Sequence, residues 1–280
     1  MGSHSQRQGG AVLGSPIAHS LSPVLHQAAY DALGLTGWTY RAIECPEADL
    51  GSTLEALDRE GLVGASLTMP LKRAVMPMLA ASDDVAGLVG GANTVRFDDR
   101  GWLGSNTDVP GMVAALRPEI AGIGEGPSAC VLGAGATAAA AIAAVAQLGF
   151  SRVEVVARRP EQVAALVELA TAVNVGLAAR AWDDAAAALA APVVISTTPA
   201  AAAADLKDSI PGQLGVLFDV IYAPWPTPLA TAWTAAAGRV IGGLELLVEQ
   251  AALQVELMTG REAPVTAMRE AGYAALARRA

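Results

Sequence analysis

The sequence has few cysteines and no long apolar run. Its only cysteines are Cys45 and Cys130, too few to build a framework of disulfides. Residues 1–10 lack the apolar stretch of a secretory signal. No segment offers the roughly 20 apolar residues, uninterrupted by charge, glycine or proline, that a membrane-spanning helix needs. We therefore expect a soluble, cytoplasmic protein without a membrane partner.

Metal ions and nucleic acids are not expected as partners either. His4, His19 and His26 are the only histidines, and none belongs to an H-x-x-x-H or Cys/His cluster that could hold zinc. The formal net charge of -9 disfavours nucleic acid, because its phosphates are bound by clustered lysine and arginine. A local site for a small anion stays compatible with this charge.

Lysine is also scarce, since only Lys72 and Lys207 occur among 18 basic residues. An ammonium group in a tuned environment can exchange its proton near neutral pH, whereas a guanidinium group cannot. A lysine kept in an arginine-rich sequence therefore marks either a position that arginine cannot fill or a solvated helix start. The composition leaves both interpretations open.

Short apolar runs alternate with helical patterns, which predicts an α/β fold. With 280 residues the chain is long enough for two domains of about 100 to 200 residues each. Strands are expected at 11–13, 39–43 and 64–67, and in a second series at 129–132, 153–156, 193–195, 216–218 and 239–241. Helices are expected at 23–33, 49–60, 244–258 and 264–277. A further helix is expected to end at residue 148, and another to begin at residue 160.

This pattern predicts two domains. The first is an α/β domain of residues 11–108, completed by C-terminal helices within 244–280 that pack back on it. The second is a Rossmann-type domain of residues 109–243, with a parallel, helix-flanked sheet.

The start of the second domain fits a dinucleotide site. It matches the pattern G-x-G-x-x-A directly after a buried-strand pattern and at the start of an alanine-rich helix. Small residues there let backbone N–H groups approach a pyrophosphate at the helix N-terminus. The expected phosphate-binding residues are Gly133, Ala134, Gly135, Ala136 and Thr137.

The end of the next strand distinguishes NAD from NADP. An acidic residue there binds the ribose 2′-hydroxyl of NAD, whereas a positive residue accepts the 2′-phosphate of NADP. The sequence reads Ala157-Arg158-Arg159, with two guanidinium groups and no carboxylate, so NADP is the expected cofactor. The segment Ile195-Ser196-Thr197-Thr198-Pro199, which closes a later strand, is expected to line the same crevice.

Ser20 and Ser22 stand around a turn that opens a helix. Hydroxyl groups and helix-start amides can bind a carboxylate, and serines at such positions also serve as helix N-caps. These two residues alone leave both roles open.

Several short motifs, among them the segments 14–23 and 64–72, follow one another along the chain. Both the motifs and their order resemble the shikimate dehydrogenase family. The segment 14–23 resembles the family's N-terminal signature, and the segment 64–72 resembles its lysine-bearing segment. The further matching motifs are Gly91-Ala92-Asn93-Thr94, Gly104 to Asp108, Asp219 to Tyr222 with Pro224 and Thr227, and Gly243 through Gln250-Ala251.

The resemblance implies an NADPH-dependent, reversible reduction of 3-dehydroshikimate to shikimate, with Lys72 and Asp108 as the catalytic pair. It also implies that Val220 and Gly243 line the nicotinamide end of the cofactor site and that Asp84 approaches the cofactor. The residues that it implies around the substrate are Ser20, Ser22, Thr68, Asn93, Tyr222 and Gln250.

The sequence departs from the family pattern at three places. Ser66 stands where many relatives have asparagine, and Gln27 replaces a common asparagine after His26. Ala157-Arg158-Arg159 replaces the usual Asn-Arg-Thr, so that Arg159 adds charge for a 2′-phosphate. The alternatives are a quinate/shikimate dehydrogenase that uses NAD and a regulatory dinucleotide-binding module without catalysis. Intact Lys72, Asn93 and Asp108 argue against the regulatory module. The sequence leaves a monomer and a homodimer equally open.

Overall fold

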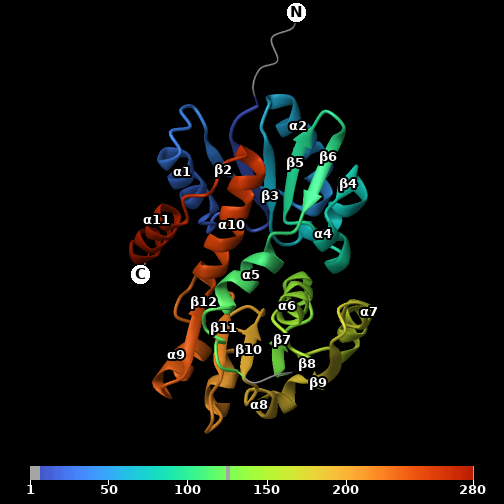
Figure 1. The fold of residues 1–280 in the computed structure, drawn as a ribbon, viewed down its shortest axis with the longest axis vertical. Helices are drawn as coiled ribbons and strands as arrows, with labels where there is room; N and C mark the ends of the chain where they lie inside the picture. Colours follow the sequence, from blue (N-terminus) through green and yellow to red (C-terminus); the bar gives the residue numbers. More distant parts are fainter. Residues whose placement is uncertain (1–6, 124–126, 280) are drawn as a thin grey trace, which may run out of the picture. The chain divides into compact units, whose positions relative to one another are not determined.

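The computed structural model describes residues 7–123 and 127–279. The chain divides into two compact units: unit 1 comprises Met1–Thr107 and Leu247–Ala280, and unit 2 comprises Asp108–Leu246. Asp108, which we expected at the end of the first domain, thus begins the second. The return to unit 1 comes at Leu247 rather than at residue 244. Each unit has a six-stranded sheet with helices packed against it, so the expected α/β fold class is confirmed (Figure 1).

The sheet of unit 1 has the strand order β2-β1-β3-β5-β6-β4. Its strands β1, β2 and β3 are parallel, whereas β5 runs antiparallel to both β3 and β6. The strands are β1 (Gly10–Gly14), β2 (Tyr40–Glu44), β3 (Gly64–Leu67), β4 (Ala81–Ser82), β5 (Thr94–Asp98) and β6 (Gly101–Ser105).

The hairpin of β5 and β6 was not predicted. Its inward side chains Val95 and Phe97 alternate with more exposed residues, as in a half-buried strand. The Oδ1 of Asp98 accepts the N–H of Arg100 at 3.0 Å, and Gly101 has φ +111°. An Asx turn followed by a glycine with positive φ is a chemically favoured way to reverse the chain.

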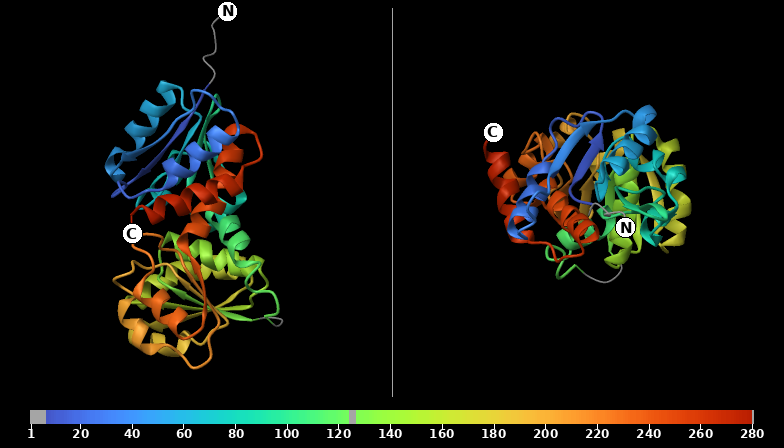
Figure 2. Two further views of the ribbon diagram at one scale, coloured as in Figure 1. Left: turned by 90° about the vertical axis from the view of Figure 1, so that its left-hand side faces the viewer. Right: turned by 90° about the horizontal axis from the view of Figure 1, so that it is seen from above.

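Helices cover both faces of this sheet (Figure 2). Because successive strand side chains point to opposite faces, Leu13 joins the core beneath α2 and α3, whereas Val12 packs in the other core with Tyr30 of α1 and Met258 of α10. The C-terminal helix α11 packs on α1. The helices are α1 (Ser22–Ala32), α2 (Leu50–Glu60), α3 (Leu71–Ala74), α4 (Asp84–Val89), α10 (Gly243–Thr259) and α11 (Val265–Ala277).

A chain of buried polar side chains crosses the core beneath α1 and α10. The hydroxyl groups of Tyr40 and Ser66 lie 2.5 Å apart, and the His26 ring stacks on Tyr40 with ring centroids 3.7 Å apart. The Nε2 of His26 donates to the Oε1 of Gln254 at 3.2 Å. In turn, Gln254 donates to the carbonyl oxygen of Asn93 at 3.3 Å. These contacts satisfy polar groups that burial would otherwise penalise.

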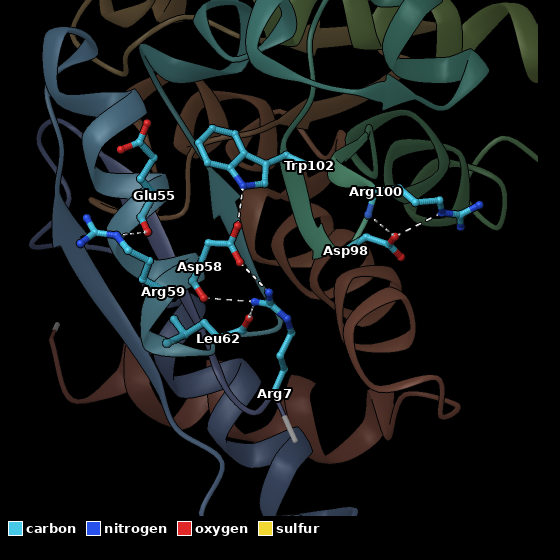
Figure 3. A network of polar contacts seen from close by, with 8 residues as sticks. All are labelled: Arg7, Glu55, Asp58, Arg59, Leu62, Asp98, Arg100 and Trp102. Carbon is cyan, nitrogen blue, oxygen red and sulfur yellow. Dashed lines mark hydrogen bonds and ion pairs between the residues drawn. The ribbon is translucent and has the colours of Figure 1, made fainter. Parts of the chain in front are cut away.

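A second polar network ties the N-terminal segment to unit 1 (Figure 3). Arg7 forms an ion pair with Asp58 at 2.6 Å and donates to the carbonyl oxygen of Leu62 at 3.0 Å. The other carboxylate oxygen of Asp58 accepts the indole N–H of Trp102 at 2.9 Å. Residues before β1, at the end of α2 and on β6 are thereby held together.

The sheet of unit 2 is parallel throughout, with the strand order β12-β11-β10-β7-β8-β9. The order reverses at β7 and β10, which is where open α/β sheets bind dinucleotides. The strands are β7 (Ser128–Leu132), β8 (Arg152–Ala157), β9 (Gly176–Ala181), β10 (Val193–Ser196), β11 (Val216–Asp219) and β12 (Arg239–Gly242).

Helices α8 and α9 lie on one face of this sheet, and α5 and α6 lie on the other (Figure 2). Trp233 of α9 is fully buried against Leu132 and other strand residues. Among the described residues, no helix is both long and apolar enough to cross a membrane. The helices are α5 (Asp108–Leu116), α6 (Ala136–Gln147), α7 (Val167–Ala172), α8 (Ala185–Ala188) and α9 (Pro228–Ala235).

The elements between β8 and β10 differ most from the sequence pattern. The edge strand β9 was not predicted, because its alanines are mostly exposed and lack the apolar alternation of a half-buried strand. The helix expected from residue 160 begins as a 3₁₀ helix, Pro160–Leu166, and becomes α-helical only in α7.

We predict that His26 makes unit 1 sensitive to acid. Burial lowers the pKa of His26 to about 3, so the folded state stays unprotonated while the unfolded chain binds a proton below about pH 6.5. Stability is therefore complete above this pH and falls as the pH drops toward about 3, by at most about 1.4 kcal/mol per pH unit.

Urea unfolding across this range, followed for the unsubstituted chain and for His26→Gln and His26→Phe, measures this slope. Both variants are expected to lose stability less steeply on acidification, whatever their stability at neutral pH. An unchanged slope in both variants would show that His26 does not account for the acid sensitivity.

Candidate active site

The expected substrate residues of unit 1 gather at one edge of its sheet. Strands β1, β3 and β6 end at this edge and β5 begins there, since Ser66 pairs with Thr94, which pairs with Ser105. Thr68 therefore follows β3 at the same edge where Asn93 precedes β5. In open α/β sheets, ligands bind outside the carboxyl ends of the parallel strands.

Asn93 is the centre of this edge and is 2% exposed. Its Nδ2 donates to the Oγ1 of Thr107 at 2.9 Å and to the Oε1 of Gln250 at 3.2 Å, and its Oδ1 accepts the N–H of Thr107 at 2.8 Å. The Nε2 of Gln250 donates to the carbonyl oxygen of Leu247 at 3.0 Å. Two expected substrate residues, Asn93 and Gln250, are thus in contact. Thr107 was missed, although it lies within the motif that ends at Asp108.

Ser20 and Ser22 lie at the start of α1. The Oγ of Ser20 accepts the N–H of Ser22 at 3.2 Å, so Ser20 caps a helix-start donor. The loop before them is held by Glu44 at the end of β2, whose carboxylate accepts the N–H of Ile17 at 3.0 Å and the hydroxyl of Ser15. Glu44 was not predicted, because nothing in the order of residues along the chain indicates this contact.

Lys72 lies in the short helix α3, directly after the turn that follows β3. The N–H of Leu71 donates to the carbonyl oxygen of Thr68 at 2.8 Å, which closes this turn. The carbonyl oxygen of Lys72 accepts the N–H of Ala92 at 2.9 Å. The backbone of Lys72 therefore adjoins the residue that precedes Asn93.

Asp84 is an exposed residue at the start of α4. The neighbouring Asp83, which was not predicted, makes the structural contacts here: it accepts the N–H of Ala86 at 2.7 Å and that of Asn106 at 3.3 Å. The side chain of Asn106 donates to the carbonyl oxygen of Gly91 at 2.7 Å. Asp83 and Asn106 thus connect the start of α4, the end of β6 and the segment before Asn93 by hydrogen bonds.

In unit 2, the carboxyl ends of β7, β8, β9 and β10 surround a cavity of about 460 Å³. The expected cofactor residues that line it are Gly133, Ala134, Gly135, Ala157, Arg158, Arg159 and Thr197. Ala136 and Thr137 form the first turn of α6 beside it. Thr198 and Pro199, from the segment expected to line the crevice, also line this cavity. The lining residues that were not predicted are Gln162 and Trp182.

The turn between β7 and α6 fits a phosphate group. Gly133 has φ +108°, and a Cβ there would lie 2.6 Å from the Oγ1 of Thr197. A Cβ on Gly135 would meet no atom within 4 Å, so the start of α6 faces open space where an anion can approach its N–H groups. Among the described residues, the buried Oγ1 of Thr198 on the cavity wall has no hydrogen-bond partner. This hydroxyl group suits a polar ligand atom.

Val220 and Gly243 meet at the end of β12. A Cβ on Gly243 would overlap the carbonyl oxygen of Val220, so only glycine permits this approach. The two residues expected at the nicotinamide end of the cofactor site are thus neighbours within unit 2.

The loop that carries Tyr222 is fixed by Asp219. The carboxylate of Asp219 accepts the hydroxyl of Thr227 at 2.6 Å and the N–H of Ile221 at 3.2 Å. Burial raises the pKa of Asp219, while these two hydrogen bonds oppose the rise. Asp108, the expected catalytic residue that belongs to unit 2, is the first residue of α5 and directly follows Thr107.

A metal centre has no support in the part of the chain that the structure describes, where no group of three or more His, Cys, Asp or Glu side chains could hold an ion. The site chemistry consists instead of hydroxyl, amide, guanidinium and ammonium groups, with carboxylates that mostly accept backbone hydrogen bonds.

Two family models match the chain. The shikimate dehydrogenase substrate binding domain matches residues 12–95, and the shikimate 5'-dehydrogenase C-terminal domain matches residues 243–271. The chain is 34% identical to the shikimate dehydrogenase (NADP(+)) of Microcystis aeruginosa, over 93% of this chain and 94% of that protein.

Two solved structures are similar over nearly the whole chain. The shikimate dehydrogenase of Mycobacterium tuberculosis is 45% identical with a TM-score of 0.86, over 95% of this chain and 99% of that one. The shikimate 5-dehydrogenase of Thermus thermophilus, in complex with NADP(H) and shikimate, is 32% identical with a TM-score of 0.81, over 96% of this chain and 100% of that one. The chain therefore belongs to the shikimate dehydrogenase family.

Proposed function

We propose that the protein catalyses the reversible, NADPH-dependent reduction of 3-dehydroshikimate to shikimate. The observation that carries this proposal is the combination of two sites in one chain. In unit 1 the carbonyl oxygen of Lys72 accepts the N–H of Ala92, which directly precedes the buried Asn93 that contacts Gln250. In unit 2 a glycine-rich turn and two arginines line one cavity. The similar family members are named for the same substrate and the same cofactor.

NADP is the cofactor for which unit 2 is built. Arg158 and Arg159 are exposed at the cavity and offer planar donors to a 2′-phosphate. The amides at the start of α6 bind the pyrophosphate, and Val220 and Gly243 line the nicotinamide end. Asp84, an exposed residue at the start of α4, is a further cofactor contact.

When bound, NADPH supplies the hydride that reduces the ring ketone. Lys72 donates a proton to the ketone oxygen and stabilises the negative charge that develops there. Asp108 orients the ammonium group of Lys72 and accepts a hydrogen bond from a ring hydroxyl. A lysine is required at this position because arginine holds its proton too tightly.

The remaining residues recognise the substrate. Ser20 and Ser22 hold the carboxylate, with the helix-start amides of α1 beside them. Asn93 and Gln250 present amides whose orientation is fixed by their mutual hydrogen bond and by Thr107. Thr68 and Tyr222 complete the set of groups around the ring.

We also propose a cytoplasmic location, since Cys45 and Cys130 are both buried as free thiols. A reducing compartment keeps such thiols unpaired.

An assay at 340 nm with shikimate or quinate, each with NADP or NAD, tests the reaction. Oxidation of shikimate with NADP is expected to be fastest. Faster oxidation of quinate with NAD would identify a quinate/shikimate dehydrogenase instead. Binding of NADPH without any oxidation of shikimate at high enzyme concentration would indicate a regulatory module.

Replacing Lys72 tests the proton transfer. Lys72→Ala is expected to lower kcat by about 10² to 10⁴ with little change in NADPH affinity, and Lys72→Arg is expected not to restore it. Lys207→Ala is the matched control, because Lys207 is the only other lysine and is exposed in unit 2. Turnover of Lys72→Ala within about tenfold of the unsubstituted enzyme would remove Lys72 from this role.

The two glycines of the phosphate-binding turn are expected to respond differently to alanine. Gly133→Ala forces a positive φ on alanine and a clash with Thr197, which should lower both the cofactor-free Tm and NADPH affinity. Gly135→Ala has room in the folded protein and should keep its Tm but lose about tenfold in NADPH affinity, since its methyl group stands where the pyrophosphate approaches. Unchanged affinity of Gly135→Ala would place the pyrophosphate elsewhere.

A further inference from the structure

The cofactor cavity of unit 2 contains one large aromatic side chain that the dinucleotide motifs do not include. Trp182 lines this cavity together with Arg158, Arg159 and Gln162. It is the first residue after β9 and opens a 3₁₀ helix, Trp182–Asp184. No motif in the sequence indicated it.

Strand register explains why Trp182 lies beside the arginines. Strands β8 and β9 are parallel neighbours, and Ala157 pairs with Ala181 at their carboxyl ends. The residue that follows each strand is Arg158 after β8 and Trp182 after β9. Since adjacent strands lie about 4.8 Å apart, these two residues leave neighbouring strand ends, and both line the cavity.

The packing of Trp182 gives it a fixed position. It is partly buried and packs against the core cluster of unit 2 that includes Leu132 and Val156. The part of the ring that this core does not cover lines the cavity. An aromatic ring held in this way loses little further freedom when a ligand binds.

The order of the strand ends defines which part of a dinucleotide reaches Trp182. The phosphate-binding turn follows β7, the two arginines follow β8, and Trp182 follows β9, so successive strands lead from the pyrophosphate to the 2′-phosphate and beyond it. The group next to the phosphorylated ribose of NADP is adenine, a flat aromatic base. Flat aromatic groups stack on indole rings.

We propose that Trp182 is the platform on which the adenine ring of NADP(H) stacks, while Arg158 and Arg159 hold the 2′-phosphate. The inference rests on the proposed function for the identity of the cofactor. The proposed stacking interaction, however, involves only the adenosine half of NADP(H). Trp182 is a positioning residue, because it lies far along the cofactor from the reacting carbon.

Adenosine 2′,5′-bisphosphate is the probe that tests this inference, because it carries the adenine and the 2′-phosphate without the nicotinamide. Titrated into the unsubstituted protein, it is expected to quench tryptophan fluorescence, since a stacked base quenches an indole. Calorimetry gives the affinity independently of fluorescence. Neither measurement needs the substrate or hydride transfer, so a failure of the proposed function would be seen separately in the 340 nm assay.

Three substitutions separate stacking from packing. Trp182→Phe keeps an aromatic face and is expected to lose most of the quenching but to bind within about threefold of the unsubstituted protein. Trp182→Leu keeps apolar volume for the core and is expected to lose the quenching and about tenfold in affinity, as is Trp182→Ala. The Tm without ligand shows whether each variant is folded, and Trp182→Leu keeps the test valid if Trp182→Ala unfolds.

Trp38→Phe is the matched control, because Trp38 is a partly buried tryptophan of unit 1. It is expected to keep both the quenching and the affinity. Full quenching in Trp182→Phe, or unchanged affinity in a folded Trp182→Leu, would overturn the inference and leave Trp182 as a core residue only.

Discussion

The side chain of Asn93 holds together three parts of unit 1 that are distant in sequence. Its amide bonds to Thr107, which is 14 positions away, and to Gln250, which is 157 positions away. A primary amide suits this position because it donates twice and accepts at the same time. In a buried setting each of these groups must find a partner, so a change at any one of the three residues leaves the others unsatisfied. The geometry of the sheet edge where the expected substrate residues Thr68, Asn93 and Gln250 gather depends on this one amide.

In unit 2, glycine residues rather than an amide side chain determine the shape of the expected site. Gly243 brings two backbone segments closer than any side chain would allow, and Gly133 leaves room for the side chain of Thr197. Sites built from backbone proximity keep their shape without long side chains. A short polar side chain such as that of Thr198 loses little conformational entropy when it binds a ligand.

Much of this organisation could be predicted from the sequence, because it depends on neighbours along the chain. The strands β1, β3 and β7 and the helices α1, α6, α10 and α11 follow from local apolar periodicity, and the cradle at Gly133 follows from a contiguous motif. What could not be predicted depends on tertiary contacts. The side chain of Glu44 contacts the Ser15 loop, and Gln254 contacts His26. Trp182 comes to line the same cavity as Arg158 only through strand register. No spacing in the sequence records such pairs.

The division of unit 1 into two sequence segments has a consequence for biosynthesis. Val12 and Tyr30 lie on the sheet face that Met258 of α10 helps to cover, yet the whole of unit 2 is translated before Met258 emerges from the ribosome. During that interval this apolar face and the buried His26 lack their C-terminal partners, including Gln254. Unit 2 is contiguous and can complete its own core first. The core of unit 2 can thus close while this face of unit 1 still lacks the residues that cover it.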